Sequence, residues 1–282
     1  MKIGHTGITW GIPGDTETAY RDTAELGYLS FETFAFTIIE WNAKPGGYRA
    51  LINRYGIPTS AAYVYKEWID PATAASDLDA AKREADAARE AGASALVLQG
   101  GSRPPGGHDH DALRRLGEAL NAIGAHCRDI GLVAALHPHT GTAIETGAEI
   151  DTIMELTDPA LVGFAPDTGQ IAKGGSDIID VLKSKLDRIE HVHLKDWCGD
   201  LLFDADGREK DPTGYAGYEP IGNGVLPMPE ILEILASANR DFWINVELDG
   251  TSRAPRPPRE AAAMSREYLG SILGDKVAWT NT

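Results

Sequence analysis

The chain has 282 residues, of which 43% are hydrophobic and 24% are charged, an ordinary composition for a globular protein. Its formal net charge is −16 and its pI is near 4.9. Because neutralising phosphates requires clustered Lys and Arg, we expect no nucleic-acid partner. No apolar run reaches the ~18 residues that a membrane span needs, so we expect no membrane partner.

Cysteine usage bears on the compartment. The two cysteines, Cys127 and Cys198, form neither a CxxC motif nor a disulfide framework. Such sparse usage is typical of a reducing environment. The N-terminal residues also lack the apolar core of a secretion signal. We therefore expect a cytoplasmic protein, with a homo-oligomer as an open alternative to a monomer.

Short apolar runs, many of them rich in β-branched residues, recur along the chain. They predict strands that are covered on both faces, as in a parallel sheet. The eight runs cover residues 2–9, 30–35, 58–65, 93–99, 132–137, 161–165, 188–195 and 242–248.

Helical patterns separate these runs. Asp15 and Ser176 are expected to cap the helices that follow them, and Gly27, Gly92 and Gly131 are expected to end helices. The predicted helices cover residues 15–26, 77–91, 109–130, 149–156, 176–186, 229–238 and 258–272, with a weaker prediction over 46–55.

Strict alternation of strands and helices predicts a single parallel (β/α)₈ barrel over residues 1–282. An open, doubly wound sheet is the alternative, but no GxGxxG motif opens a helix after the first strand. The segment 197–224 is rich in Gly, Asp and Pro. We expect it to form a long loop over the C-terminal face of the barrel, where such loops often serve as lids.

Active sites of such barrels lie at the C-terminal ends of the strands. Four successive strand ends carry imidazoles, carboxylates and a lysine: His137, His139 and nearby Glu145 on the fifth, Asp167 on the sixth, His193 and Lys195 on the seventh, and Glu247 on the eighth. These residue types predict a divalent-metal site. A salt-bridged cluster without metal is the alternative.

Side-chain alternation orders the seventh strand. His191, His193 and Lys195 share one face, and Val192 and Leu194 share the other. The apolar pair should pack against helices, which turns the polar set toward the barrel axis. Since His191 lies deeper, His193 is the better ligand candidate. The same alternation turns the carboxylate of the eighth strand inward.

Several motifs resemble those of the xylose-isomerase-like barrels, the sugar isomerase/epimerase superfamily that also includes endonuclease IV. Within it, the chain is most similar to the inosose (2-keto-myo-inositol) dehydratase group. The resemblance covers most of the chain and is strongest from about residue 130 onward. The motifs are His-Pro-His-Thr-Gly-Thr at 137–142, Asp-Thr-Gly at 167–169, His-Val-His-Leu-Lys-Asp at 191–196 and Pro-Ile-Gly-Asn-Gly-Val at 220–225.

The resemblance implies a set of metal ligands. The chain also departs from the family pattern at two positions. The implied ligands are Glu145, Asp167, His193 and Glu247. Three carboxylates and one imidazole suit Mn²⁺ first, with Co²⁺ or Mg²⁺ as alternatives. Many relatives have Glu where this chain has His137, so the ligand role passes to Glu145. Many also have His at position 170, a substrate contact in relatives, where this chain has Gln170.

The hypothesis for function is a metal-dependent dehydratase that acts on a polyhydroxylated ketone, either a keto-cyclitol or a keto-sugar. The metal would stabilise an enediolate, and a general base would take the α-proton. The base candidates are His139 and His137, with Lys195 as acid or electrostatic partner. Candidate substrate-binding residues are Gln170, Glu32, Trp10 and Arg253.

The same chemistry leaves alternatives open. Return of the proton to carbon gives a sugar isomerase or epimerase, and loss of an aglycone gives elimination on a 3-keto-glycoside. Dehydration is preferred because the His-x-His-x-Gly-Thr motif is found in a narrower part of the superfamily than the His-Val-His-Leu-Lys-Asp motif. A phosphodiester hydrolase of the endonuclease IV type lacks support in so acidic a chain. A sugar-binding barrel without catalysis does not explain why four successive strand ends carry candidate metal ligands.

Overall fold

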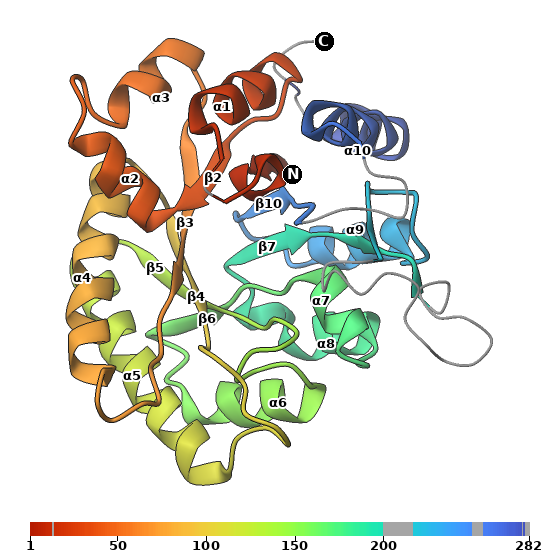
Figure 1. Cartoon of the computed structure of the whole chain (residues 1–282). Coiled ribbons are helices and arrows are strands. Elements are labelled where there is room, and N and C mark those ends of the chain that lie inside the picture. The colour runs from red at the N-terminus through yellow and green to blue at the C-terminus, as the bar shows by residue number, and fades with distance from the viewer. Residues whose placement is uncertain (13, 200–216, 250–255, 278, 280–282) are drawn as a thin grey trace.

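The computed structural model describes the chain except for residues 13, 200–216, 250–255, 278 and 280–282 (Figure 1). Its main sheet, within these described residues, has eight parallel strands in the spatial order β6-β5-β4-β3-β2-β1-β10-β7. These strands are β1 (Lys2–Thr6), β2 (Phe31–Phe34), β3 (Thr59–Tyr65), β4 (Ala95–Gln99), β5 (Val133–His137), β6 (Val162–Phe164), β7 (His191–Leu194) and β10 (Trp243–Val246).

Two parallel bridges bring the ends of this sheet together. Phe164 of β6 bridges to Ile189, and Asp167 bridges to His193 of β7. The strands therefore form a (β/α)₈ barrel, and the open doubly wound alternative is wrong. Each strand lies within one of the eight predicted apolar runs.

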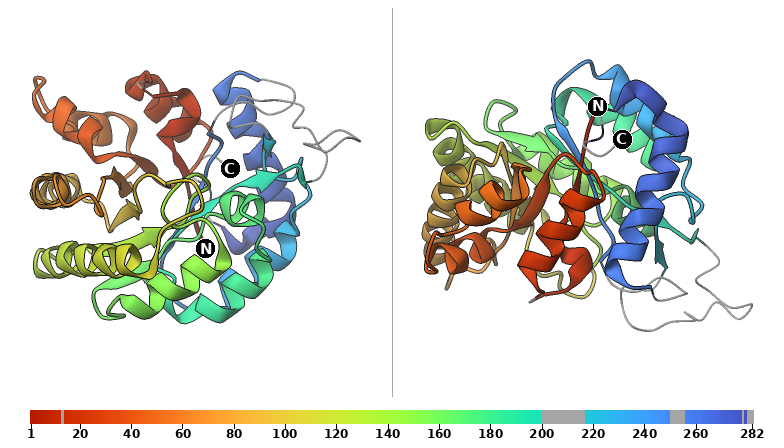
Figure 2. Two further views of the ribbon diagram at one scale, coloured as in Figure 1. Left: turned by 60° about the horizontal axis from the view of Figure 1, so that its bottom comes forward. Right: turned by 90° about the horizontal axis from the view of Figure 1, so that it is seen from above.

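Helices surround the strands (Figure 2). Those that match predicted segments are α1 (Thr16–Glu25), α3 (Arg49–Tyr55), α4 (Ala74–Glu90), α5 (His110–Asp129), α6 (Gly147–Leu156), α8 (Ile178–Lys185), α9 (Met228–Ser237) and α10 (Pro258–Leu273). Asp15 caps α1 as predicted, by accepting the Thr18 N–H. The predicted Ser176 cap is wrong, because Asp177 accepts the first N–H groups of α8.

Two further helices follow strands directly. These are α2 (Ala35–Asn42) and α7 (Thr168–Lys173), and neither was predicted. The sequence of α2 is apolar around most of its circumference, and α7 is too short to show a helical period. Both helices begin at the C-terminal rim, so they help to shape the site. Within the described residues, no helix is long and apolar enough to cross a membrane.

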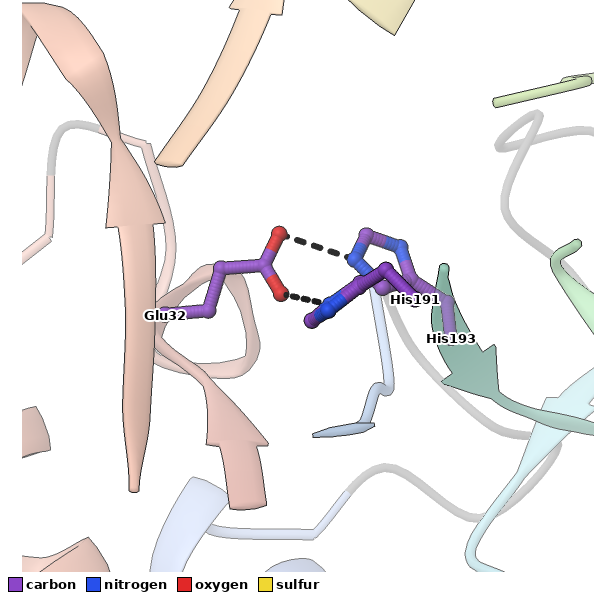
Figure 3. A group of neighbouring side chains, drawn as sticks. All are labelled: Glu32, His191 and His193. Carbon is purple, nitrogen blue, oxygen red and sulfur yellow. Dashed lines mark hydrogen bonds and ion pairs between the residues drawn. The ribbon is translucent and has the colours of Figure 1, made fainter. Parts of the chain in front are cut away.

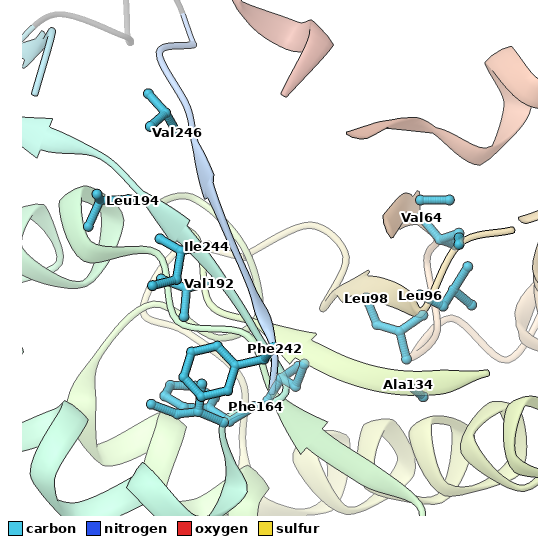
Figure 4. Packing of buried hydrophobic residues seen from close by; sticks show 14 of the residues in the cluster. Val64, Leu96, Leu98, Ala134, Phe164, Val192, Leu194, Phe242, Ile244 and Val246 are labelled. Carbon is cyan, nitrogen blue, oxygen red and sulfur yellow. The ribbon is translucent and has the colours of Figure 1, made fainter. Parts of the chain in front are cut away.

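The outward faces of the strands form the main core. Val192 and Leu194 of β7 are buried with Ile244 and Val246 of β10, and all four lie on one side of their strands (Figure 4). Fully burying each such side chain contributes roughly 1.5–3 kcal/mol. This packing confirms the predicted alternation on the seventh strand, so its polar residues face the barrel axis.

The inside of the barrel has two unlike halves. Small side chains cluster on β3 to β6 and just beyond: Ala61, Ala95, Val97, Ala135 and Ala165. The strands β2, β7 and β10 instead carry buried polar residues, among them Glu32, His191, His193 and Asn245. The polar half therefore supplies the buried groups from which a site can form.

Asp196 anchors the chain after β7. It begins β8 (Asp196–Trp197), which pairs with β9 (Tyr218–Glu219). Its carboxylate accepts the N–H groups of Gly222 at 2.9 Å, Gly224 at 3.0 Å and Leu226 at 3.2 Å. A Cβ at position 224 would lie 2.1 Å from Asp196 Oδ1, which explains the glycine there. Most of the predicted loop 197–224 lies outside the described residues.

We expect Asp196→Asn to destabilise the protein by roughly 1–3 kcal/mol, because the amide nitrogen cannot accept a backbone N–H in place of a carboxylate oxygen. Urea unfolding followed by circular dichroism measures the change. Asp241→Asn is the matched control, since the Asp241 side chain is 75% exposed and pairs with Lys2 at the surface. Equal stability of the two variants would contradict the role of Asp196.

Candidate active site

Polar atoms from four strand ends converge at the C-terminal rim. His137, Asp167 and His193 are fully buried, and one ligand atom from each lies within 4.8 Å of the others. His137 Nε2 is 4.0 Å from Asp167 Oδ2, and Glu247 Oε2 is 3.1 Å from His193 Nδ1. The fold therefore brings together three of the four predicted ligands, and it adds His137.

The atoms of this cluster fit a divalent cation. Within the described residues, no hydrogen bond reaches His137 Nε2, Asp167 Oδ2 or His193 Nδ1, although Lys195 Nζ lies 3.0 Å from Asp167 Oδ2 and Glu247 Oε2 lies 3.1 Å from His193 Nδ1. Buried polar atoms are nearly always hydrogen-bonded, and exceptions often mark an ion site. Burial, followed by the nearby cationic groups, lowers the pKa of His137 well below its usual value. A neutral imidazole is the form that ligates metals.

Glu145 lies elsewhere. Its Oε2 accepts the Gly141 N–H at 2.9 Å and lies 3.5 Å from Arg103 Nε. Its side chain is 26% exposed, and it belongs to neither group of potential ligand atoms found in the described residues. The chain after β5 folds back, with the His139 N–H bonded to the Ile144 carbonyl, and this carries Glu145 toward Arg103. Ligation by Glu145 stays a prediction, and the geometry favours His137.

Glu32 of β2 ties the seventh strand to the opposite side of the barrel (Figure 3). Its two oxygens each lie 2.8 Å from an imidazole Nε2, one of His191 and one of His193. Asn245 donates to it as well, at 2.6 Å. These are hydrogen-bond distances, so the second group of potential ligand atoms, formed by Glu32, His191 and His193, is already bonded internally.

The Glu32 contact sets the orientation of His193. Because Nε2 of His193 faces Glu32, its Nδ1 faces Glu247, as in other carboxylate–histidine–metal arrangements. Burial opposes the charged form of His193, but Glu247 and Glu32 outweigh it and raise its pKa to about 9. A cation bound at Nδ1 would therefore have to displace a proton from this ring. Burial likewise opposes ionisation of Glu32, yet the two imidazoles hold its pKa well below the usual value. Glu32 thus orients His193. Because Glu32 also lines the cavity, its predicted contact with substrate stays a prediction.

Lys195 neutralises the carboxylates beside the cluster. Its Nζ lies 3.0 Å from Asp167 Oδ2, 2.8 Å from Glu247 Oε1 and 2.5 Å from Asp249 Oδ1. Burial opposes its charge, but the three carboxylates outweigh burial and raise its pKa well above the usual value. Its side chain is fully buried and is not part of the cavity lining, so its contribution is electrostatic.

The Asp-Thr-Gly motif serves both the cluster and Lys195. Asp167 caps α7 with one oxygen by accepting the Gln170 N–H, which leaves Oδ2 directed at the cluster. The Thr168 hydroxyl bonds the backbone carbonyl and N–H of Lys195, at 2.6 and 2.9 Å. A Cβ at Gly169 would lie 2.8 Å from Lys195 Cγ, so only glycine lets the lysine side chain pass.

His139 faces the cavity with a defined tautomer. Its Nδ1 lies 2.7 Å from the Thr140 carbonyl, which can only accept, so Nδ1 carries the proton. Gln170 Nε2 then donates to His139 Nε2 at 2.8 Å. The Gln170 amide cannot flip, because its oxygen accepts from the Thr140 and Tyr218 hydroxyls, each at 2.6 Å. Gln170 therefore lies behind His139 and is not among the cavity-lining residues.

A cavity of about 370 Å³ opens beside the cluster. His139, Glu247 and Asp249 line one end, and residues of β1 to β4 line the rest. Trp10, which was expected to contact substrate, instead donates its indole N–H to Asp22 at 3.1 Å and does not line the cavity. Arg253 lies outside the described residues.

Three residues of the site were given no role from the sequence. Asp249 shares the inward face with Glu247, two positions earlier, so alternation could have found it. Tyr63 of β3 shares the inward face with Ala61, two positions earlier, so alternation could have found it as well. Tyr218 comes from the long segment after β7, where no periodic pattern marks the position that reaches the site.

A parallel eight-stranded barrel with buried ligand atoms at its C-terminal rim is typical of a metal-dependent enzyme. The chain matches the xylose isomerase-like TIM barrel family over residues 20–271, and it belongs to that family. The predicted resemblance is thereby confirmed.

Individual proteins extend this comparison. An inosose dehydratase of Geobacillus kaustophilus is 28% identical, over 97% of this chain and 95% of the relative. An inosose dehydratase of Halalkalibacterium halodurans is 35% identical, but only over 55% of this chain and 52% of the relative. The structure of a probable 3-DHS dehydratase from Bacillus anthracis superposes with a TM-score of 0.76 at 13% identity, covering 95% and 98% of the two chains, which supports the fold.

Glu32→Gln is expected to weaken Mn²⁺ binding by about 10–100-fold, the usual effect of removing a carboxylate behind a histidine ligand. The amide can accept from only one imidazole, so the other ring loses its partner. Isothermal titration calorimetry measures the affinity, and circular dichroism checks the fold. Glu40→Gln, on the exposed side of α2, is the control. Unchanged affinity in Glu32→Gln would rule out this positioning role.

Proposed function

We propose that the chain is a metal-dependent lyase that removes water from a keto-cyclitol or keto-sugar, with 2-keto-myo-inositol as the first candidate substrate. The observation that carries the proposal is the convergence of buried ligand atoms from His137, Asp167 and His193, for which no hydrogen bond is found within the described residues, next to Glu247 of the cavity lining. The inosose dehydratases among the relatives support the choice of reaction.

The proposed metal ligands are His137, Asp167, His193 and Glu247. When bound there, a divalent cation supplies Lewis-acid stabilisation of negative charge on the substrate's carbonyl and neighbouring oxygens. Two imidazole nitrogens and two carboxylate oxygens favour Mn²⁺ or Co²⁺ over Mg²⁺, which prefers oxygen ligands. Mn²⁺ is our first choice.

His139 is the proposed general base. Its Nε2 carries no proton in the observed arrangement, and the residue lines the cavity. For Nε2 to take an α-proton, the Gln170 amide must first release its hydrogen bond to that atom. The proton can then pass to the departing hydroxyl, so that one imidazole serves both halves of the elimination and water is released. Gln170 holds the ring in place, and Lys195 balances the surrounding carboxylates.

Epimerisation or isomerisation is the second candidate. In those reactions the proton returns to carbon and no water leaves, while the metal ligands and the base stay the same. Elimination of an aglycone from a 3-keto-glycoside differs only in the leaving group. Product analysis separates these outcomes.

The two candidates for the fourth ligand can be told apart by mutation. We expect His137→Ala to reduce Mn²⁺ affinity by at least 100-fold, since one of the four ligands is lost. Glu145→Gln should keep the affinity within about threefold, because Glu145 pairs with Arg103. Calorimetry and metal analysis of the dialysed proteins provide the measurement. The reverse pattern would restore the set implied by the family resemblance.

With Mn²⁺ bound, the protein should convert 2-keto-myo-inositol into a product that absorbs in the ultraviolet, because dehydration creates a conjugated enone or diketone. NMR should show loss of one hydroxyl-bearing carbon. Chelation should abolish turnover, and added Mn²⁺ should restore it. Full activity after chelation would defeat the metal-dependent mechanism, and an isomeric product would point to the epimerase alternative.

A further inference from the structure

A row of aromatic rings leads from the cluster toward the surface. The Tyr63 ring lies 5.3 Å from the His137 ring and 6.1 Å from the His193 ring. Phe34 meets Tyr63 edge-on at 5.4 Å, and Phe36 stacks on Phe34 at 5.1 Å with an interplanar angle of 23°. Tyr63, Phe34 and Phe36 all line the cavity, so the row forms one wall of it.

The outer end of this wall is unusually apolar for exposed surface. Six large hydrophobic residues are exposed within the described part of the chain, and three of them, Ile12, Phe36 and Tyr65, line this one cavity. Their exposed fractions are 53%, 39% and 43%. Isolated exposed apolar residues need no explanation, but a cluster at a cavity mouth is typical of a binding site.

Most polar groups of the cavity are buried or paired. Glu247 and Asp249 stand at the cluster end with His139, and Lys66 is paired with Glu84 at 2.7 Å. The other polar lining residues, Thr6, Glu32, Thr33 and Gln99, are buried. The Tyr65 hydroxyl is already bonded to Ser102 and Glu67. A polyhydroxylated ring therefore finds its partners near the cluster, whereas the outer end offers mainly ring faces and alkyl groups.

We propose that Ile12, Phe34, Phe36 and Tyr65 form an outer subsite that binds an aryl group attached to the polyhydroxylated ring of the substrate. The proposal rests on the keto-sugar form of the proposed function, which places that ring at the cluster, since 2-keto-myo-inositol carries no such substituent. A cavity of about 370 Å³ lies within the ~300–1,000 Å³ typical of drug-sized ligands, so it accommodates a ring with a substituent. Offset and edge-on stacking on Phe34 and Phe36 supplies the attraction.

The chemistry of the surface selects an aryl group over two other occupants. A second sugar ring would need hydrogen-bonding partners, and the outer end presents mainly hydrocarbon. A second copy of the chain would also cover Ile39, which is 42% exposed on α2 but does not line the cavity. Ile39 is therefore the residue that separates a ligand subsite from a protein interface.

Calorimetry on the Mn²⁺-loaded protein tests the subsite with two probes, phenyl and methyl 3-keto-β-D-glucopyranoside. The phenyl probe should bind about tenfold more tightly, as expected from stacking on two rings. Phe36→Ala should remove most of this difference and leave the methyl probe unaffected. Ile39→Ala, on the same helix, should preserve the difference.

Three outcomes would overturn the subsite: equal affinity for the two probes, an unchanged preference in Phe36→Ala, or failure to bind either probe. Dissociation of an oligomer by both Phe36→Ala and Ile39→Ala in sedimentation would identify an interface instead. Turnover of 2-keto-myo-inositol without phenyl preference would leave the proposed function standing. Phenyl preference without turnover of any keto-substrate would sink the proposed function and keep the subsite.

Discussion

The site depends on one buried ammonium group. Lys195 Nζ lies within 3.0 Å of carboxylate oxygens from Asp167, Glu247 and Asp249, in a place closed to solvent. Burying such charges without a partner costs several kcal/mol per ion, so these carboxylates can lie together only because the lysine is there. The residues next to Asp167 in the sequence accommodate this lysine. Gly169 leaves space for the lysine side chain, and Thr168 fixes its backbone.

The two halves of the barrel interior have different roles. The strands β5 and β7, with the segments beyond β5, β6 and β10, supply the proposed ligands and the proposed base, and β2 supplies the carboxylate that orients His193. The cavity extends along β1 to β4 and the segments that follow β1, β2 and β3, and the rings of Phe34, Phe36 and Tyr63 form part of its wall. A polar centre therefore borders an apolar wall, a combination that holds a reactive ring at one end and a substituent at the other.

Much of the fold could be predicted from the sequence, because buried parallel strands form short apolar runs that differ from the longer periodic patterns of the helices. The ends of elements were harder: α7 follows Asp167 at once and is too short to show periodicity. Side-chain alternation correctly predicted the inward face of the seventh strand. Alternation could not show that Glu32, which is far away in the sequence, would form a hydrogen bond with His193, because that contact crosses the barrel. Nor could it show that the loop after β5 carries Glu145 to Arg103.

Charge balance gives a reason to prefer His137 over Glu145 as a ligand. Burial keeps the imidazole of His137 neutral, so the set of His137, Asp167, His193 and Glu247 brings two negative charges to a divalent cation. A third carboxylate would leave that buried set with an excess negative charge, which the interior penalises. Glu145 instead has Arg103 as its counter-charge near the surface. Fewer anionic ligands also leave the cation a stronger Lewis acid, which suits the polarisation of a ketone.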